Sequence, residues 1–193
     1  MFSFFGGGLG GSPESDGLNH ANNPISTATI PPVEILEAAY PVMFSQWALR
    51  PESAGAGTHR GGVGAVYEVE VLTDAQVSLL GERGKAAPFG VAGGTEAAKN
   101  RFSWNSTAGE GTPPMVSKIT GVAVAKGGRV RLETPGGGGW GDPHGRDPAA
   151  VARDVALGFV TAETARGTYG VALDADGAVD GAATAILRKG EHA

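Results

Sequence analysis

The stretch Leu132-Glu-Thr-Pro-Gly-Gly-Gly-Gly-Trp-Gly141 places four consecutive glycines directly after a predicted strand. Glycine has no Cβ atom, so this loop can adopt positive φ and leaves its backbone amides uncovered. Successive amides can form a nest that binds an anion. Alternatively, the glycines are required where two backbones pass closely, for instance under a partner subunit. Gly136, Gly137, Gly138 and Gly139 are therefore candidate substrate-binding or interface residues.

Glycine is enriched along the whole chain. It accounts for 33 of 193 residues, about 17%, against ~7% in ordinary proteins. Only 18% of the residues are charged, whereas 41% are hydrophobic. A disordered chain is normally rich in charge and poor in apolar residues, and collagen requires glycine at every third position. The composition therefore indicates a folded, loop-rich globular chain.

Charge, cysteine content and the N-terminal sequence exclude several classes of protein. The net charge is −5 with no run of Lys and Arg, so no nucleic-acid partner is expected. The absence of cysteine excludes disulfides and thiolate zinc sites and fits a reducing compartment. The N-terminus lacks a basic region before its short apolar run, and no apolar stretch reaches the ~18 residues of a membrane span. We therefore expect a cytoplasmic protein without a membrane partner.

The clearest strand signal covers 65–72, where apolar and acidic residues alternate. Its apolar face contains Ala65, Tyr67, Val69 and Val71, and its polar face contains Glu68 and Glu70. Further strands are predicted at 42–50, 75–80, 119–125 and 129–133, with Lys126-Gly-Gly128 joining the last two as a hairpin. The stretch 84–114 is rich in turn residues.

Short helices are predicted mainly near the C-terminus. Pro31-Pro32 opens one helix, Asp147-Pro148 caps and opens a second, and others are expected at 161–166 and 181–189. The fold class is therefore α+β and β-rich, with short antiparallel strands and glycine-rich loops. Residues 1–30 are predicted to form an extended glycine-rich arm that packs on a partner, and residues 31–193 a single β-rich domain.

A search for catalytic motifs finds little. The four histidines lack ligand partners at helical spacing, so no metal site is expected. Asp142 and His144 form either a ligand pair or a solvated loop pair. No Gly-x-Ser-x-Gly or Ser-x-x-Lys motif marks a nucleophile. Gly55-Ala-Gly-Thr-His-Arg60 begins like a dinucleotide fingerprint but leads into a strand instead of a helix.

Polar residues in the glycine-rich loops are further candidates. His20, in Asn19-His-Ala-Asn-Asn23, either lines a site together with Asn23 or is a loop histidine hydrogen-bonded to backbone. Arg60, beside Gly61-Gly62, either binds an anion or ties down loop carbonyls.

Taken in order, many stretches resemble the C-terminal part of the hydantoinase B/oxoprolinase family. Each match is weak alone, but their order and spacing extend over nearly the whole chain. The matching stretches are 16–24, 32–41, 49–64, 81–84, 88–94, 133–139, 147–158 and 169–171.

The resemblance implies a component of an ATP-dependent cyclic-amide hydrolase of hydantoinase or 5-oxoprolinase type. Its expected partners are an A-type subunit, which binds ATP, and the N-terminal part of a B-type subunit, which in relatives carries the metal-binding His/Asp cluster. ATP and a divalent metal are thus expected in partner chains, with no cofactor bound by this chain. This chain resembles the family pattern from a point inside that pattern, beginning at Phe4-Phe-Gly-Gly-Gly-Leu-Gly-Gly11. We therefore expect the chain alone to be inactive. The alternatives are a piece of an ATP-dependent ketone carboxylase and a non-catalytic structural or assembly subunit.

Overall fold

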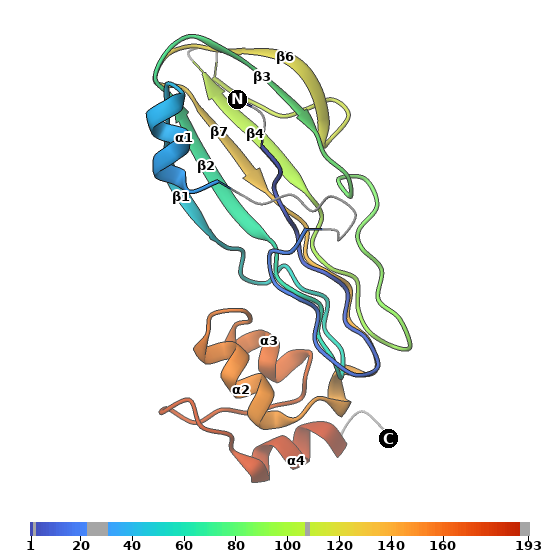
Figure 1. Ribbon diagram of the computed structural model, residues 1–193. Coiled ribbons are helices and arrows are strands. Elements are labelled where there is room, and N and C mark those ends of the chain that lie inside the picture. Colours follow the sequence, from blue (N-terminus) through green and yellow to red (C-terminus); the bar gives the residue numbers. More distant parts are fainter. Residues whose placement is uncertain (2, 23–30, 107–108, 190–193) are drawn as a thin grey trace.

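The chain is arranged along one long axis, with the strands and the short helix Val33–Ala39 at one end, the helices of residues 148–189 at the other, and extended segments between them (Figure 1). The computed structural model describes residues 1, 3–22, 31–106 and 109–189. Antiparallel strands in a larger and a smaller sheet, with a few short helices, make up its regular structure. The predicted β-rich α+β fold class is confirmed.

In the described part of the chain, five antiparallel strands form the larger sheet, in the spatial order β1-β2-β7-β4-β5. They are β1 (Val42–Leu49), β2 (Ala65–Val71), β7 (Arg129–Glu133), β4 (Arg101–Ser106) and β5 (Gly109–Gly111). Tyr67 of β2 lies opposite Leu132 of β7, which lies opposite Phe102 of β4. These side chains share one face because side chains alternate along a strand.

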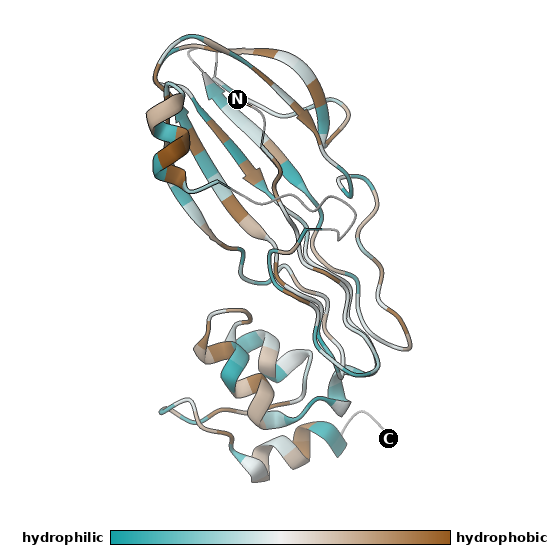
Figure 2. Cartoon of the chain, viewed as in Figure 1, coloured by the Kyte–Doolittle hydropathy of each residue, from teal (hydrophilic) through white to brown (hydrophobic). Residues whose placement is uncertain are grey.

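The smaller sheet covers this apolar face. It pairs β3 (Ala75–Leu80) with β6 (Lys118–Val124), and Val77, Leu79 and Ile119 pack against the apolar cluster of the larger sheet. The predicted apolar face of β2 is confirmed, since its four side chains are all buried. The alternation of hydrophobic and hydrophilic residues along the strands is visible in Figure 2.

The predicted hairpin between 119–125 and 129–133 is wrong. β6 pairs with β3, whereas β7 pairs with β2 and β4. The intervening turn closes on the end of β2: Gly127 N–H donates to Val71 O, and Val71 N–H donates to Gly128 O. The turn is as tight as predicted, but it carries the chain from the smaller sheet to the larger one, so the two strands that it joins do not pair with each other.

The stretch predicted to be turn-rich also contains strands β4 and β5. Apolar alternation in β4 is limited to Phe102 and Trp104, and β5 is only three residues long and contains two glycines. Pairing with β7 and packing against Leu132 therefore stabilise β4. This is a tertiary effect that local sequence does not show.

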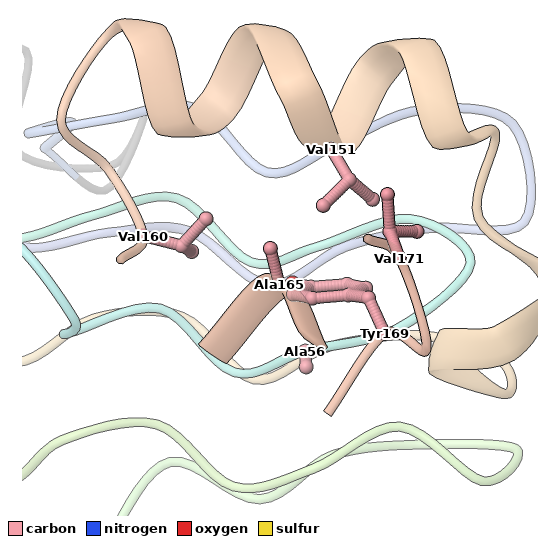
Figure 3. Packing of buried hydrophobic residues seen from close by; sticks show 6 residues of the cluster. All are labelled: Ala56, Val151, Val160, Ala165, Tyr169 and Val171. Atoms are coloured by element: carbon pink, nitrogen blue, oxygen red, sulfur yellow. The ribbon is translucent and has the colours of Figure 1, made fainter. Parts of the chain in front are cut away.

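The helices are α1 (Val33–Ala39), α2 (Pro148–Ala156), α3 (Ala162–Gly167) and α4 (Gly181–Lys189), with a 3₁₀ turn η2 at Pro143–Gly145. The predicted cap at Asp147 is present, since its side chain accepts from Ala149 N–H. Thr161 is the N-cap of α3, and its side chain accepts from Thr164 N–H. The helical end has its own apolar cluster (Figure 3), formed by Ala56, Val151, Val160, Ala165, Tyr169 and Val171.

Extended segments connect the sheets to the helices. We call residues 6–11, 53–62, 88–95 and 134–141 the glycine bundle, because they run side by side in Figure 1 and are rich in glycine. Backbone hydrogen bonds join them: Gly8 N–H donates to Pro135 O, Gly55 N–H to Gly137 O, and Val91 N–H to Gly139 O. The bundle is therefore held together by backbone–backbone contacts.

The glycines of the bundle are required by the closeness of the neighbouring backbones. A Cβ atom would lie 1.7 Å from Gly137 O at Gly61, 1.8 Å from Leu9 O at Gly137, and 1.9 Å from Ser53 O at Gly136. The φ angles of Gly136, Gly137, Gly138 and Gly139 lie outside the left-handed region. The backbones that pass close to Gly136–Gly139 belong to this chain, so these glycines pack against the chain's own segments.

The described part of the predicted arm, residues 3–22, packs on this chain. Gly8 N–H donates to Pro135 O, Gly17 N–H to Arg60 O, and His20 N–H to Val63 O. The predicted boundary at residue 30 lies outside the described residues. An additional contact of this segment with a partner stays a prediction.

We expect Gly137→Ala to destabilise the fold by at least about 3 kcal/mol, because its Cβ would overlap Leu9 O and force backbones apart. Gly10→Ala is the matched control in the same bundle, since its Cβ would lie 3.7 Å from Gly138 O, an ordinary contact. Urea unfolding of the 193-residue chain measures both. Equal stability of the two variants would contradict the packing argument.

Candidate functional site

The candidate site residues lie in separate places. His20 lies against the larger sheet, Arg60 lies at the helical end of the chain, and the Gly136–Gly139 stretch lines a groove of the glycine bundle. Asn23 lies outside the described residues. The contacts around each described position decide which chemistry it can support.

His20 is held by contacts to the strands. Its φ is 45°, in the left-handed region, and its N–H donates to Val63 O. The ring Nε2 is hydrogen-bonded to the Tyr67 hydroxyl. The indole of Trp47 lies edge-on to the imidazole at a centroid distance of 6.0 Å.

The His20–Tyr67 pair is neutral at physiological pH. Burial lowers the pKa of His20. Burial also raises the pKa of the Tyr67 hydroxyl, and this outweighs a hydrogen bond to Trp47 that lowers it. Tyr67 therefore keeps its proton, and the tautomer of the imidazole decides whether Nε2 donates to the hydroxyl oxygen or accepts from the hydroxyl. In the tautomer that carries its proton on Nε2, Nδ1 can accept a proton while Tyr67 fixes the ring.

Arg60 is buried and engaged inside the chain. Its Nε donates to Asp154 Oδ1 at 3.0 Å, and its Nη1 donates to Gly61 O at 2.8 Å and to Asn19 Oδ1 at 3.1 Å. Asn19 Oδ1 also accepts from Val63 N–H. This geometry matches the interpretation in which the guanidinium ties down loop groups.

Arg146 extends this arrangement into a buried charge network. Its guanidinium binds both carboxylate oxygens of Asp16, at 2.6 and 2.7 Å, and donates to Asp154 Oδ2 at 2.8 Å. Burial alone would lower the pKa of Arg146. The hydrogen bond to Asp16 and the charges of both carboxylates outweigh this effect, so the pKa of Arg146 lies above its usual value. Arg60, Arg146, Asp16 and Asp154 therefore join the N-terminal segment, the glycine bundle and α2.

The Gly136–Gly139 stretch forms the floor of a groove of about 340 Å³. Residues 8–11 line its sides, together with Arg83, Pro88, Phe89 and Val91. Within the described residues, the N–H groups of Gly136 and Gly138 have no hydrogen-bond acceptor, whereas those of Gly137 and Gly139 donate to Gly62 O and Thr95 O. The N–H groups of Gly136 and Gly138 are the ones that an anion nest would use, and the anion-nest interpretation stays a prediction.

Sequence reasoning missed most of the charge network. Asp16, Arg146 and Asp154 were not singled out as partners of Arg60. Asp154 lies on α2 with a relative exposure of 2%, and an aspartate on the buried side of an amphipathic helix is a usable signal, because a buried charge needs a partner. The 130-residue separation of Asp16 and Arg146 gives no local indication that they pair.

Two further observations concern metals and membranes. In residues 1, 3–22, 31–106 and 109–189, no group of three or more His, Asp or Glu side chains is placed to hold a metal ion. Of the helices in these ranges, none combines the length and the apolar character needed to cross a bilayer.

The chain is similar to proteins of one family. The model of the family described as Hydantoinase B/oxoprolinase matches residues 1–143. The caprolactamase subunit beta of Pseudomonas jessenii is 36% identical over 157 residues, 79% of this chain and 27% of that protein.

Solved structures agree with this likeness. The ATP-dependent caprolactamase from Pseudomonas jessenii superposes with a TM-score of 0.80 at 31% identity, over 96% of this chain and 33% of that chain. Nucleotide-free acetone carboxylase superposes with a TM-score of 0.82 at 26% identity, over 96% of this chain and 29% of that chain. The chain thus spans between 27% and 33% of the length of these proteins.

Arg146→Met is expected to destabilise the chain by about 3–5 kcal/mol, because it leaves the buried Asp154 carboxylate with one guanidinium fewer. The control is Arg129→Met, which removes an arginine that is 53% exposed and should cost about 1 kcal/mol or less. Urea unfolding at neutral pH compares the two. A smaller loss for Arg146→Met than for Arg129→Met would contradict a structural role of the network.

The network also predicts a loss of stability in acid. Burial raises the pKa of Asp16, but the hydrogen bond and charge of Arg146, together with Arg60, bring it below the usual value of 3.8. The unfolded chain therefore binds the proton first, so this contribution is complete above pH 3.8 and is lost as pH falls below it. In Asp16→Asn, Tm should be lower at neutral pH and should fall less on acidification. Asp176→Asn, in an exposed turn, should keep the wild-type profile.

Proposed function

Since the chain belongs to the hydantoinase B/oxoprolinase family, we propose that it is a component of an ATP-dependent hydrolase of cyclic amides. The observation that carries the proposal is the likeness to ATP-dependent caprolactamase, which extends over 96% of this chain at 31% identity. Caprolactam is a cyclic amide, so the proposed substrate class follows from that likeness.

The proposed complex contains an ATP-binding A-type subunit and the remaining part of a B-type subunit. In support, the relative from Pseudomonas jessenii is named a subunit beta, and this chain spans 27% of its length. We assign ATP and a divalent metal to these partner chains and expect no turnover by this chain alone.

ATP suits this reaction for a chemical reason. The resonance of an amide makes its carbonyl carbon a poor electrophile. Transfer of a phosphoryl group to the amide oxygen gives an O-phosphorylated imidate, which water attacks at carbon. The ring C–N bond then breaks as the nitrogen takes up a proton, which leaves an acyl phosphate. A second water molecule attacks the carbonyl carbon of this acyl phosphate and releases phosphate and the carboxylate. A positioned proton donor or acceptor assists such steps.

His20 is the residue of this chain that we assign to that task. Its imidazole is neutral, half-buried and fixed by the Tyr67 hydroxyl, and in the tautomer with its proton on Nε2 the Nδ1 atom can accept a proton. Trp47 packs against the ring and restricts its orientation. In the proposed complex, His20 faces a cavity that this chain shares with the rest of the B-type subunit.

A ketone carboxylase component is the second candidate. The superposition on acetone carboxylase, with a TM-score of 0.82, favours it, and activation of a ketone oxygen by ATP follows similar chemistry. The third candidate is a structural or assembly subunit. The close-packed glycine bundle favours that role, since its glycines are explained by packing alone.

Reconstitution separates these candidates. The chain is co-expressed with its genomic neighbours that encode an A-type subunit and the upstream part of a B-type subunit, and the purified complex is assayed for ATP hydrolysis. Turnover stimulated by hydantoins, 5-oxoproline or caprolactam supports the hydrolase. Bicarbonate-dependent consumption of a ketone supports the carboxylase, and failure to form a complex contradicts both enzyme proposals.

His20→Asn tests the assigned role in that complex. Asparagine tolerates the left-handed φ of this position, so the backbone should be kept while the imidazole is lost. We expect kcat to fall by about 100-fold with unchanged assembly on gel filtration. His59→Asn replaces another partly exposed histidine and should leave kcat unchanged. Full activity of His20→Asn would contradict this role and leave His20 as a loop histidine that is held by hydrogen bonds.

A further inference from the structure

A pocket of about 320 Å³ lies beside β4, apart from the candidate residues discussed above. Residues 101–103 line it, together with Pro113 and Val116 from the segment after β5 and Arg131 and Glu133 from β7. The described pairing of β5 with β4 covers 104–106, so in the described structure no strand flanks 101–103 on that side. The volume falls within the range of small-molecule sites, ~300–1,000 Å³.

The carboxylate in the wall of this pocket is already engaged. Glu133 accepts from Arg131 Nε at 3.1 Å and lies 3.2 Å from Arg50 Nη2. Arg131 also pairs with Glu68 on the neighbouring strand, at 3.3 Å. Arg50, Arg131 and Glu133 therefore all have a partner of opposite charge on this face of the sheet.

Arg101 takes part in none of these ion pairs. It lies directly opposite Glu133 in the strand register, yet its guanidinium makes no ion pair or hydrogen bond with any residue that the structure describes. Burial lowers the pKa of Arg50. Glu133 raises it, whereas the charges of Arg101 and Arg131 lower it further. Positive charge thus exceeds negative charge at the pocket, although the chain as a whole carries −5.

The remaining wall is largely apolar, with Ser103 and Thr112 as its polar residues, and it contains one strained residue. Phe102, Pro113 and Val116 contribute the apolar part. Val116 has a φ of 59°, which is an outlier for a β-branched side chain. Strained residues are found preferentially at ligand sites. The pocket therefore combines one unpaired guanidinium with an apolar surface.

We propose that this pocket binds a small organic acid, with its carboxylate on Arg101 and its apolar body against Pro113 and Val116. A planar carboxylate matches the paired donors of a guanidinium. The apolar wall distinguishes such a ligand from inorganic phosphate, which would gain from the charge alone. This site is separate from His20 and does not depend on the proposed hydrolase activity.

The test is an NMR titration of the full chain with benzoate, followed at the amides of Phe102 and Ser103. Benzamide, which keeps the ring but lacks the charge, and inorganic phosphate are titrated at the same ionic strength. We expect benzoate to bind at least about tenfold more tightly than either, because charge-assisted hydrogen bonds and apolar contact act together.

Substitutions locate the site. Arg101→Gln should weaken benzoate binding about tenfold at unchanged Tm, since it removes an exposed, unpaired side chain. Arg101→Lys should give an intermediate affinity because it keeps the charge but loses the paired donors. Arg129→Gln is the control, since Arg129 lies on the same sheet and is paired with Glu68 and Glu70.

Several outcomes would overturn the proposal. Equal binding of benzoate and benzamide would show that the guanidinium takes no part. Tighter binding of phosphate than of benzoate would indicate a site for inorganic anions instead. Wild-type affinity in Arg101→Gln, or an equal loss in Arg129→Gln, would place the anion outside this pocket.

Discussion

The close approach of backbones in the glycine bundle is the constraint on which the rest of the structure depends. At Gly61 and Gly137 even a methyl group would overlap a neighbouring carbonyl. The segment 53–62 leads towards β2, and 134–141 follows β7 directly. Their spacing in the bundle therefore fixes how these two strands leave the sheet, and where α2 begins at the other end.

A bundle made of glycine buries little apolar side-chain surface, so its stability needs other sources. Backbone hydrogen bonds supply one, and the buried network around Arg146 supplies another. The network links Asp16 near the N-terminus to Asp154 on α2, which clamps the bundle at the helical end. The apolar contacts between the sheets hold the opposite end.

Local signals in the sequence predicted the elements better than their connections. Alternation around Tyr67 identified β2 and its buried face, and the cap at Asp147 identified the start of α2. The pairing of β6 with β3 could not be read locally, because the turn at Gly127 fits a hairpin equally well. β4 was missed since its stability comes from β7.

The candidate site was predicted less completely than the fold. Sequence reasoning selected His20 and Arg60 as polar residues in glycine-rich loops, but it did not find Tyr67 as the hydrogen-bond partner of His20.

The glycine bundle also has a consequence for the kinetics of folding. Gly8, Gly62 and Gly137 meet through direct hydrogen bonds and backbone contacts, so segments from the beginning, middle and later part of the chain must all be present before it can close. Contacts of such sequence separation slow folding, and the bundle can close only after synthesis has passed residue 137.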